Sequence, residues 1–204
     1  MFKFINLFCL TLALSICAVA QNSGDEYNKN EFFVGYSNQQ VDRGDYTTYH
    51  GFEGSYVRNV SRYFGIKGDF SAAYKNESFD VPSAVFNGTT IPGGRFESKN
   101  SVYNFLGGVQ VKDNSSSARF KPFAHALAGI ATNRIKSSSS IATSNLRNFT
   151  VNSTGFAAAV GGGLDIKIND RFDFRAIQVD YNPVRSFRQF SNNVRFGIGI
   201  VIKK

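Results

Sequence analysis

The chain has 204 residues and a formal net charge of +8, and it is rich in glycine (19), phenylalanine (21) and tyrosine (9). Its only cysteines, Cys9 and Cys17, lie near the N-terminus, which excludes disulfides, thiol catalysis and cysteine metal sites from the rest of the chain. Glycine and aromatic residues without helical periodicity indicate an all-β protein.

Residues 1–20 have the features of a secretory signal peptide. Lys3 supplies a positive charge, a mostly apolar run follows, and Ala18–Ala20 is a small-x-small cleavage site. Residues 21–30 form a polar N-terminal linker, and residues 31–204 form the predicted domain. Because an exported chain rarely meets nucleic acid, its basicity favours anionic lipid or lipopolysaccharide phosphate as a partner and argues against nucleic acid.

Eight segments of the mature chain alternate between two kinds of side chain with the period of a β-strand. In chain order they are 32–37, 51–56, 64–74, 103–111, 120–131, 156–167, 176–181 and 193–202. In the third segment, Phe64, Ile66 and Phe70 share one face, whereas Lys67 and Asp69 lie on the other. The faces of the fifth segment do not sort cleanly.

The charged face of these segments cannot fill the core of a soluble protein, so the apolar face is predicted to contact lipid and the polar face to line a barrel. Strands of about ten residues cross a bilayer when tilted, and closure pairs every backbone group. The connections alternate between tight turns and four long loops, at 39–48, 75–99, 133–152 and 182–192. Long loops are typical of the outer face of such barrels and tight turns of the periplasmic face.

Four stretches resemble the small outer-membrane β-barrel family, which includes the barrel of outer membrane protein A and the opacity-type proteins. They are Glu31–Tyr36, Lys121–Leu127, Gln178–Tyr181 and Asn192–Ile200. The resemblance implies an eight-stranded antiparallel up-and-down transmembrane β-barrel in the bacterial outer membrane, inserted by the barrel-assembly machinery. Family members usually end on an aromatic residue, whereas this chain ends Lys203-Lys204.

The polar face supplies the candidate site. The residues predicted to form a lumenal polar network are Glu53, Lys67, Asp69, Gln110, Asp165, Lys167, Gln178, Asp180 and Arg195. Buried charges cost several kcal/mol unless they are paired, so these side chains are expected to pair and to fill the narrow lumen. The alternative is a gated pore lined by charge.

The sequence predicts no catalytic, cofactor-binding or metal-binding residue. The two histidines, His50 and His125, are isolated from other ligands, and no nucleophile motif of the Gly-x-Ser-x-Gly type occurs. Glycines 161–163 continue the strand periodicity, so they are interpreted as sites of close packing rather than as a phosphate loop.

The second long loop carries six apolar residues that form a possible surface-interaction loop: Phe79, Val81, Val85, Phe86, Ile91 and Phe96. Either the strands continue outward as a hairpin and these side chains pack together, or they form an adhesive patch. Five cations in the outer loops are predicted to face lipopolysaccharide phosphates: Arg134, Lys136, Arg147, Arg185 and Arg188.

The sequence therefore predicts a monomeric, non-enzymatic outer-membrane barrel with a filled lumen and a structural or adhesion-type role. A small-solute or ion channel of the same fold is the alternative. A soluble lipocalin-like protein is disfavoured, because its calyx needs an apolar interior and because this chain lacks tryptophan.

Overall fold

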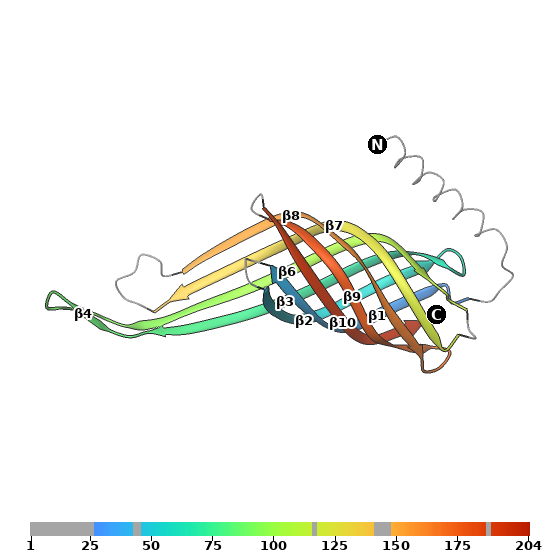
Figure 1. Ribbon diagram of the computed structural model, residues 1–204, viewed down its shortest axis with the longest axis horizontal. Coiled ribbons are helices and arrows are strands. Elements are labelled where there is room, and N and C mark those ends of the chain that lie inside the picture. The colour runs from blue at the N-terminus through green and yellow to red at the C-terminus, as the bar shows by residue number, and fades with distance from the viewer. Residues whose placement is uncertain (1–26, 43–45, 116–117, 141–147, 187–188) are drawn as a thin grey trace, which may run out of the picture.

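The computed structural model describes residues 27–42, 46–115, 118–140, 148–186 and 189–204. Eight antiparallel strands form a closed barrel in the order β1-β10-β9-β8-β7-β6-β3-β2, and β4 and β5 form a separate two-stranded sheet (Figure 1). The all-β, up-and-down barrel predicted from the sequence is confirmed. The predicted signal peptide and most of the polar linker lie outside the described residues. No helix among the described residues is long and apolar enough to cross a membrane.

The strands have the following bounds: β1 Asn30–Asp42, β2 Tyr46–Asn59, β3 Phe64–Val81, β4 Ala84–Phe86, β5 Thr89–Ile91, β6 Gly94–Lys112, β7 Phe120–Ser139, β8 Asn148–Lys167, β9 Phe172–Ser186 and β10 Gln189–Lys203.

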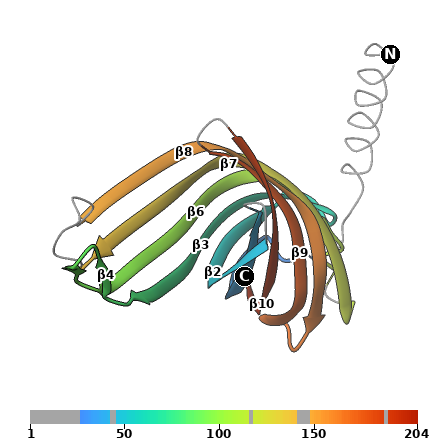
Figure 2. The same ribbon diagram turned by 60° about the vertical axis from the view of Figure 1, so that its left-hand side comes forward.

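Four neighbouring strands, β3, β6, β7 and β8, are longer than the rest, with 18 to 20 residues against 13 to 15 in β1, β2, β9 and β10. Their outer parts project beyond the barrel as a curved sheet (Figures 1 and 2). We call this sheet, residues 75–100, 134–140 and 148–156 with the β4–β5 hairpin at its tip, the wing.

Most residues of the predicted long loops over 75–99 and 133–152 continue the strands. For 75–99 this confirms the interpretation that the strands continue outward as a hairpin, whereas the strand segments within 133–152 correct the prediction of a loop. Phe79 pairs with Phe96 across β3 and β6, and their ring centroids are 5.0 Å apart. The β4–β5 hairpin turns at Asn87 and Gly88, whose φ angles of 49° and 75° fit the type I′ turn that Asn-Gly favours.

Strand β9 contains a bulge at Ala176 and Ile177, which changes the alternation along the strand. The register slips there against both neighbours, β8 and β10. Arg175 and Gln178 therefore both face the lumen. Simple alternation would instead place Ala176 on the lumenal face with Gln178. On β8, a Cβ on Gly163 would lie 2.0 Å from the carbonyl oxygen of Ile177, so this close approach requires glycine.

The wall of the barrel is apolar outside and polar inside. Ile66, Phe105 and Val160 are each more than half exposed, whereas Lys67 on the opposite face of β3 is 1% exposed. Strand β7, which did not sort from its sequence, does so here: Phe123, His125 and Leu127 are buried, whereas the alanines between them, Ala124 and Ala126, face outward.

Candidate functional site

The lumen buries twelve charged groups of balanced sign, each at most 5% exposed. Its six carboxylates are Glu31, Glu53, Asp69, Asp165, Asp173 and Asp180, and its six cations are Lys67, Lys112, Lys121, Arg175, Arg195 and Lys203. Because a buried ion is costly without a partner, this equality in number is the first condition for a stable filled lumen. A stable filled lumen also requires that opposite charges contact one another, and the side chains of the lumen do so.

Arg195 of β10 is the centre of the network. Its Nη2 donates to Asp180 at 2.7 Å, and its Nη1 donates to Asp69 at 2.8 Å and to Ser71 at 3.0 Å. Its Nε lies 3.5 Å from a carboxylate oxygen of Glu53. The planar guanidinium, with five N–H groups, can bind several acids at once in a way that a lysine cannot.

His125 of β7 extends this network across the lumen. Its Nε2 lies 2.8 Å from Asp180, and its Nδ1 lies 3.2 Å from the ammonium of Lys67, which is itself 3.6 Å from Asp69. Because Lys67 can only donate, Nδ1 accepts and Nε2 donates, which assigns a neutral imidazole. Both ring nitrogens are thus occupied in a buried position, which leaves none for proton transfer with a substrate.

The barrel end that carries the short β2–β3 and β8–β9 turns is called the turn end. The residues around Arg195 form a central cluster, and a second cluster, around Arg175, lies nearer the turn end. This guanidinium forms a two-point contact with Asp165, at 2.8 and 3.1 Å, and lies between the rings of Phe33 and Phe123, at 4.2 and 4.1 Å. Lys112 binds Asp165 at 3.1 Å. The bidentate geometry and the two aromatic faces together fix the guanidinium in place.

Gln178 joins the two clusters. Its amide nitrogen donates to Glu53 and Asp180, each at 2.8 Å, and its amide oxygen accepts from Arg175 at 2.7 Å. The other polar groups of the turn end include Glu31, which binds Lys112. The network therefore runs without interruption from the turn end to the middle of the barrel.

Above the central cluster, toward the wing, the described lumenal side chains are uncharged: apolar groups alternate with buried amides such as those of Gln39, Asn104 and Asn182. One buried group comprises Leu106, Leu127, Ala131, Ala157, Ala159 and Val184, and another comprises Val41, Tyr49, Ala73 and Val102. Leu106 interrupts the polar alternation of its strand in the sequence, and its packing in the first of these groups accounts for the interruption. Ions crossing the lumen would have to pass both the paired charges and this layer of buried uncharged side chains.

Eight of the nine residues predicted for the lumenal network are buried inside the barrel. Gln110 is 1% exposed, but neither atom of its side-chain amide has a hydrogen-bond partner among the described residues. The prediction that Lys167 belongs to the buried network is wrong. Lys167 lies at the rim, where β8 ends, and its side chain is 24% exposed and 2.7 Å from Asp170. It is the last residue of the strand, so no wall extends beyond it.

Seven titratable lumenal residues of the described chain escape the sequence prediction: Glu31, Lys112, Lys121, His125, Asp173, Arg175 and Lys203. Extending the alternation to the strand ends would find Glu31, Lys112 and Lys121, whereas the bulge hides Arg175. Lys203 appeared in the sequence as a departure from the aromatic terminus; in the structure it is buried and binds Asp173.

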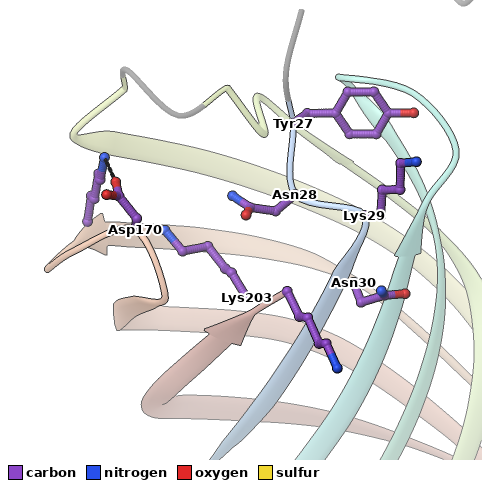
Figure 3. A pocket seen from close by; sticks show the side chains of 8 residues that line it. Tyr27, Asn28, Lys29, Asn30, Asp170 and Lys203 are labelled. Carbon is purple, nitrogen blue, oxygen red and sulfur yellow. Dashed lines mark ion pairs between the residues drawn. The ribbon is translucent and has the colours of Figure 1, made fainter.

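The turn end of the barrel opens into a recess of about 810 Å³ (Figure 3). Its lining is rich in lysine: Tyr27, Asn28, Lys29, Asn30, Lys167, Asp170, Lys203 and Lys204. In the turn after β6, hydrogen bonds from Arg62 lower the pKa of Asp113 to about 2. In the β8–β9 turn, the hydrogen bond from Lys167 lowers the pKa of Asp170.

At the other end, the structure places the predicted surface residues on strands of the wing. Phe79, Val81 and Val85 are 57%, 38% and 72% exposed, whereas Phe96 is half-buried. The side chains of Phe86 and Ile91, and all of Arg147 and Arg188, lie outside what the structure describes. Arg134, Lys136 and Arg185 are exposed.

Within the described part of the chain, no group of three or more His, Cys, Asp or Glu side chains could hold a metal ion. The buried acids are already bound by cations. The arrangement is suited to filling and stabilising a barrel.

No family model matches the sequence, and no curated protein matches it. Several solved structures share the fold. Ail, the attachment invasion locus protein of Yersinia pestis, is 14% identical with a TM-score of 0.57, and the match covers 87% of this chain and all of Ail. Ail in complex with the heparin analogue sucrose octasulfate gives a TM-score of 0.56, also at 14% identity and with the same coverage. Neisserial surface protein A is 10% identical with a TM-score of 0.51, over 88% of this chain and all of that protein.

Proposed function

We propose that this chain, which has the fold of small eight-stranded outer-membrane barrels, is an integral outer-membrane protein of a bacterium. In this proposal it is non-enzymatic and monomeric, its lumen is filled by side chains, and it acts through the surface that its wing presents. The observation that carries the proposal is the inversion of the wall, with charged groups buried inside and apolar side chains exposed outside.

The inversion has a physical explanation only in hydrocarbon. In water, an exterior with Phe32, Ile66, Phe105 and Val160 about half or more exposed would be an aggregation surface. In a bilayer the same side chains are solvated by lipid, and the closed ladder leaves no backbone group unpaired. The short turns and both described termini would face the periplasm, and the wing would face outward.

The lumen is proposed to be closed to solutes. Its charges balance, they contact one another, and a layer of buried uncharged side chains lies above them. Conductance in planar bilayers tests this point. We expect no discrete channels from the refolded protein. Ion-selective unitary currents would contradict the filled lumen and favour the small-solute or ion channel.

The wing carries a basic patch that suggests an anionic surface partner. Lys99 lies directly opposite Lys136 on β6 and β7, and Arg134 lies two residues along β7. All three side chains are exposed. Like charges directly opposite each other are destabilising, so an anionic group bound between them would relieve the repulsion. Lipopolysaccharide phosphate is the partner we propose, and the complex of Ail with a sulfated heparin analogue supports a polyanion of this kind.

Two experiments test the location and the fold. Membrane fractionation on a sucrose gradient should place the protein with the outer membrane, and the folded protein should migrate differently on a gel before and after boiling. A protein that stays soluble and folded without detergent would contradict the proposal.

The surface role is tested on the wing. The triple variant K99Q/R134Q/K136Q should bind purified lipopolysaccharide at least about tenfold more weakly than the wild type at low salt. A control double variant, K75Q/R95Q, removes two other cations of the same end, each of which contacts a neighbouring glutamate, and it should bind nearly normally. An equal loss of lipopolysaccharide binding in both variants would mean that binding depends on the overall charge of this end and not on the patch.

The tip of the wing is expected to be dispensable for folding. Replacing residues 80–95 by Asn-Gly removes the β4–β5 hairpin and leaves Phe79 and Phe96 to close a shorter hairpin. Because the removed residues form no part of the barrel wall, the variant should still show the heat-dependent shift on a gel. Loss of the folded barrel would refute this expectation.

A further inference from the structure

The net positive charge of the described residues is concentrated at the turn end of the barrel. The lumen contributes six charges of each sign. Among the described residues, the wing end presents six cations against four carboxylates, whereas the turn end presents seven cations against only two. The turn-end cations are Lys29, Arg58, Arg62, Arg119, Lys167, Arg171 and Lys204, and its carboxylates are Asp113 and Asp170. We call these seven cations the basic ring.

The basic ring follows the whole rim. Arg58 lies at the end of β2, Arg62 in the β2–β3 turn, Arg119 before β7, and Arg171 in the β8–β9 turn, with Lys204 after β10. The strand order places these positions around the closed barrel rather than on one side.

Most of the ring lacks a carboxylate partner. Arg62 and Lys167 bind the two acids of this end, at 3.0 and 2.7 Å. Arg58, Arg119 and Arg171 are exposed and have no acidic partner in the described ranges. Cations that share one rim and mostly lack a carboxylate partner repel one another, so an external anion would stabilise this rim.

The ring borders the lower edge of the apolar wall. Tyr56, Phe120 and Phe172 are 41%, 59% and 39% exposed, and each lies within two residues of an arginine of the ring. The Arg119 guanidinium lies 5.9 Å from the ring centroid of Phe120. Apolar side chains above and cations below match a lipid, whose acyl chains and phosphate are arranged in the same order.

The recess at this end adds to the same surface, because three of its lining residues, Lys29, Lys167 and Lys204, also belong to the ring (Figure 3). Lys203 and Lys167, which also line it, are held by Asp173 and Asp170. The cations available to an external anion are thus those of the outer rim.

We propose that the basic ring binds the phosphate headgroups of anionic phospholipids in the leaflet at the turn end of the barrel. The inference rests on the proposed membrane location and adds a lipid preference to it. A lipid with net negative charge, such as phosphatidylglycerol, would be held by the ring, whereas zwitterionic phosphatidylcholine would gain less from the same cations.

The test compares two spin-labelled lipids around the refolded full chain in phosphatidylcholine membranes. Electron paramagnetic resonance gives the relative association of phosphatidylglycerol and phosphatidylcholine with the protein surface. The wild type should prefer phosphatidylglycerol by about threefold at low salt. This preference should fall toward parity in 1 M salt, where the screening length is about 3 Å.

Two variants locate the preference. R58Q/R119Q/R171Q should lose most of it, because it removes three unpaired cations of the ring. The matched variant K75Q/R95Q/R185Q removes three cations from the wing end and should keep it. A wild type without preference, or equal loss in both variants, would overturn the inference.

The same samples separate this inference from the proposed function. A heat-modifiable barrel that immobilises both lipids equally would refute the lipid preference alone. A protein that immobilises neither lipid and shows no folded band on the gel would refute the membrane location itself.

Discussion

Arg195→Gln tests whether the lumenal network stabilises the barrel. The guanidinium is fully buried and contacts Asp180, Asp69 and Glu53, at 2.7, 2.8 and 3.5 Å. After its removal, Lys67 is the one cation still in contact with this group of acids, at 3.6 Å from Asp69. The substitution therefore leaves three buried carboxylates with a single neighbouring cation.

Removing one partner of a buried ion pair costs about 3–5 kcal/mol, because the remaining charge stays buried and uncompensated. We expect R195Q to lose this amount of unfolding free energy. Arg195→Lys should lose less, since it keeps the charge but cannot bind three acids at once. The double variant R195Q/D180N restores equal numbers of charges and should recover at least about 1 kcal/mol relative to R195Q.

The assay is reversible urea unfolding of refolded protein in detergent micelles. The chain has no tryptophan, so far-ultraviolet circular dichroism and gel migration follow the transition. Arg134→Gln on the wing is the matched control and should change stability by less than about 0.5 kcal/mol. If R195Q is as stable as this control, or if the double variant is the less stable of the two, the network is not what holds the lumen together.

Two further predictions concern single contacts. Asp113→Asn should lower stability at pH 5–7 by less than about 1 kcal/mol, because its ion pair with Arg62 is partly exposed. The folded pKa of about 2 lies below the ordinary value of about 3.9, so this contribution is present above the latter and disappears as the pH falls through 2; a constant difference down to pH 1 would contradict it. Phe123→Leu should cost about 1–2 kcal/mol in urea unfolding, because Arg175 loses one of its two aromatic faces. Phe105→Leu, on the exterior wall, is the control, and an equal loss there would exclude a role for the stacking.

The two-residue alternation is enough to predict the barrel and most of its interior. It assigns Lys67, Asp69, Asp180 and Arg195 to one face because each belongs to a strand whose other face is apolar. Alternation depends only on local backbone geometry, which is why it can be recognised without knowing which strands are neighbours.

What escaped prediction depends on contacts between strands. The bulge in β9 changes the parity between Arg175 and Gln178, and its position depends on β8 and β10. The burial of His125 depends on Asp180 and Lys67, which lie far away in the sequence. The outward hairpin of β3 and β6 was one of two interpretations of the sequence, whereas the outer parts of β7 and β8 were predicted as a loop because they are polar and rich in serine.

The lumen and the rim together explain how a basic chain can form a stable filled barrel. Inside, where a stray charge costs several kcal/mol, the cations and carboxylates are equal in number. The excess cations lie at the ends, where water and lipid headgroups screen them. A charge change in the lumen should therefore act on stability, whereas the same change in the basic ring should act on the lipids bound. R195Q and R58Q/R119Q/R171Q make that comparison directly, and an unstable ring variant or a lipid-altering lumenal variant would contradict this separation.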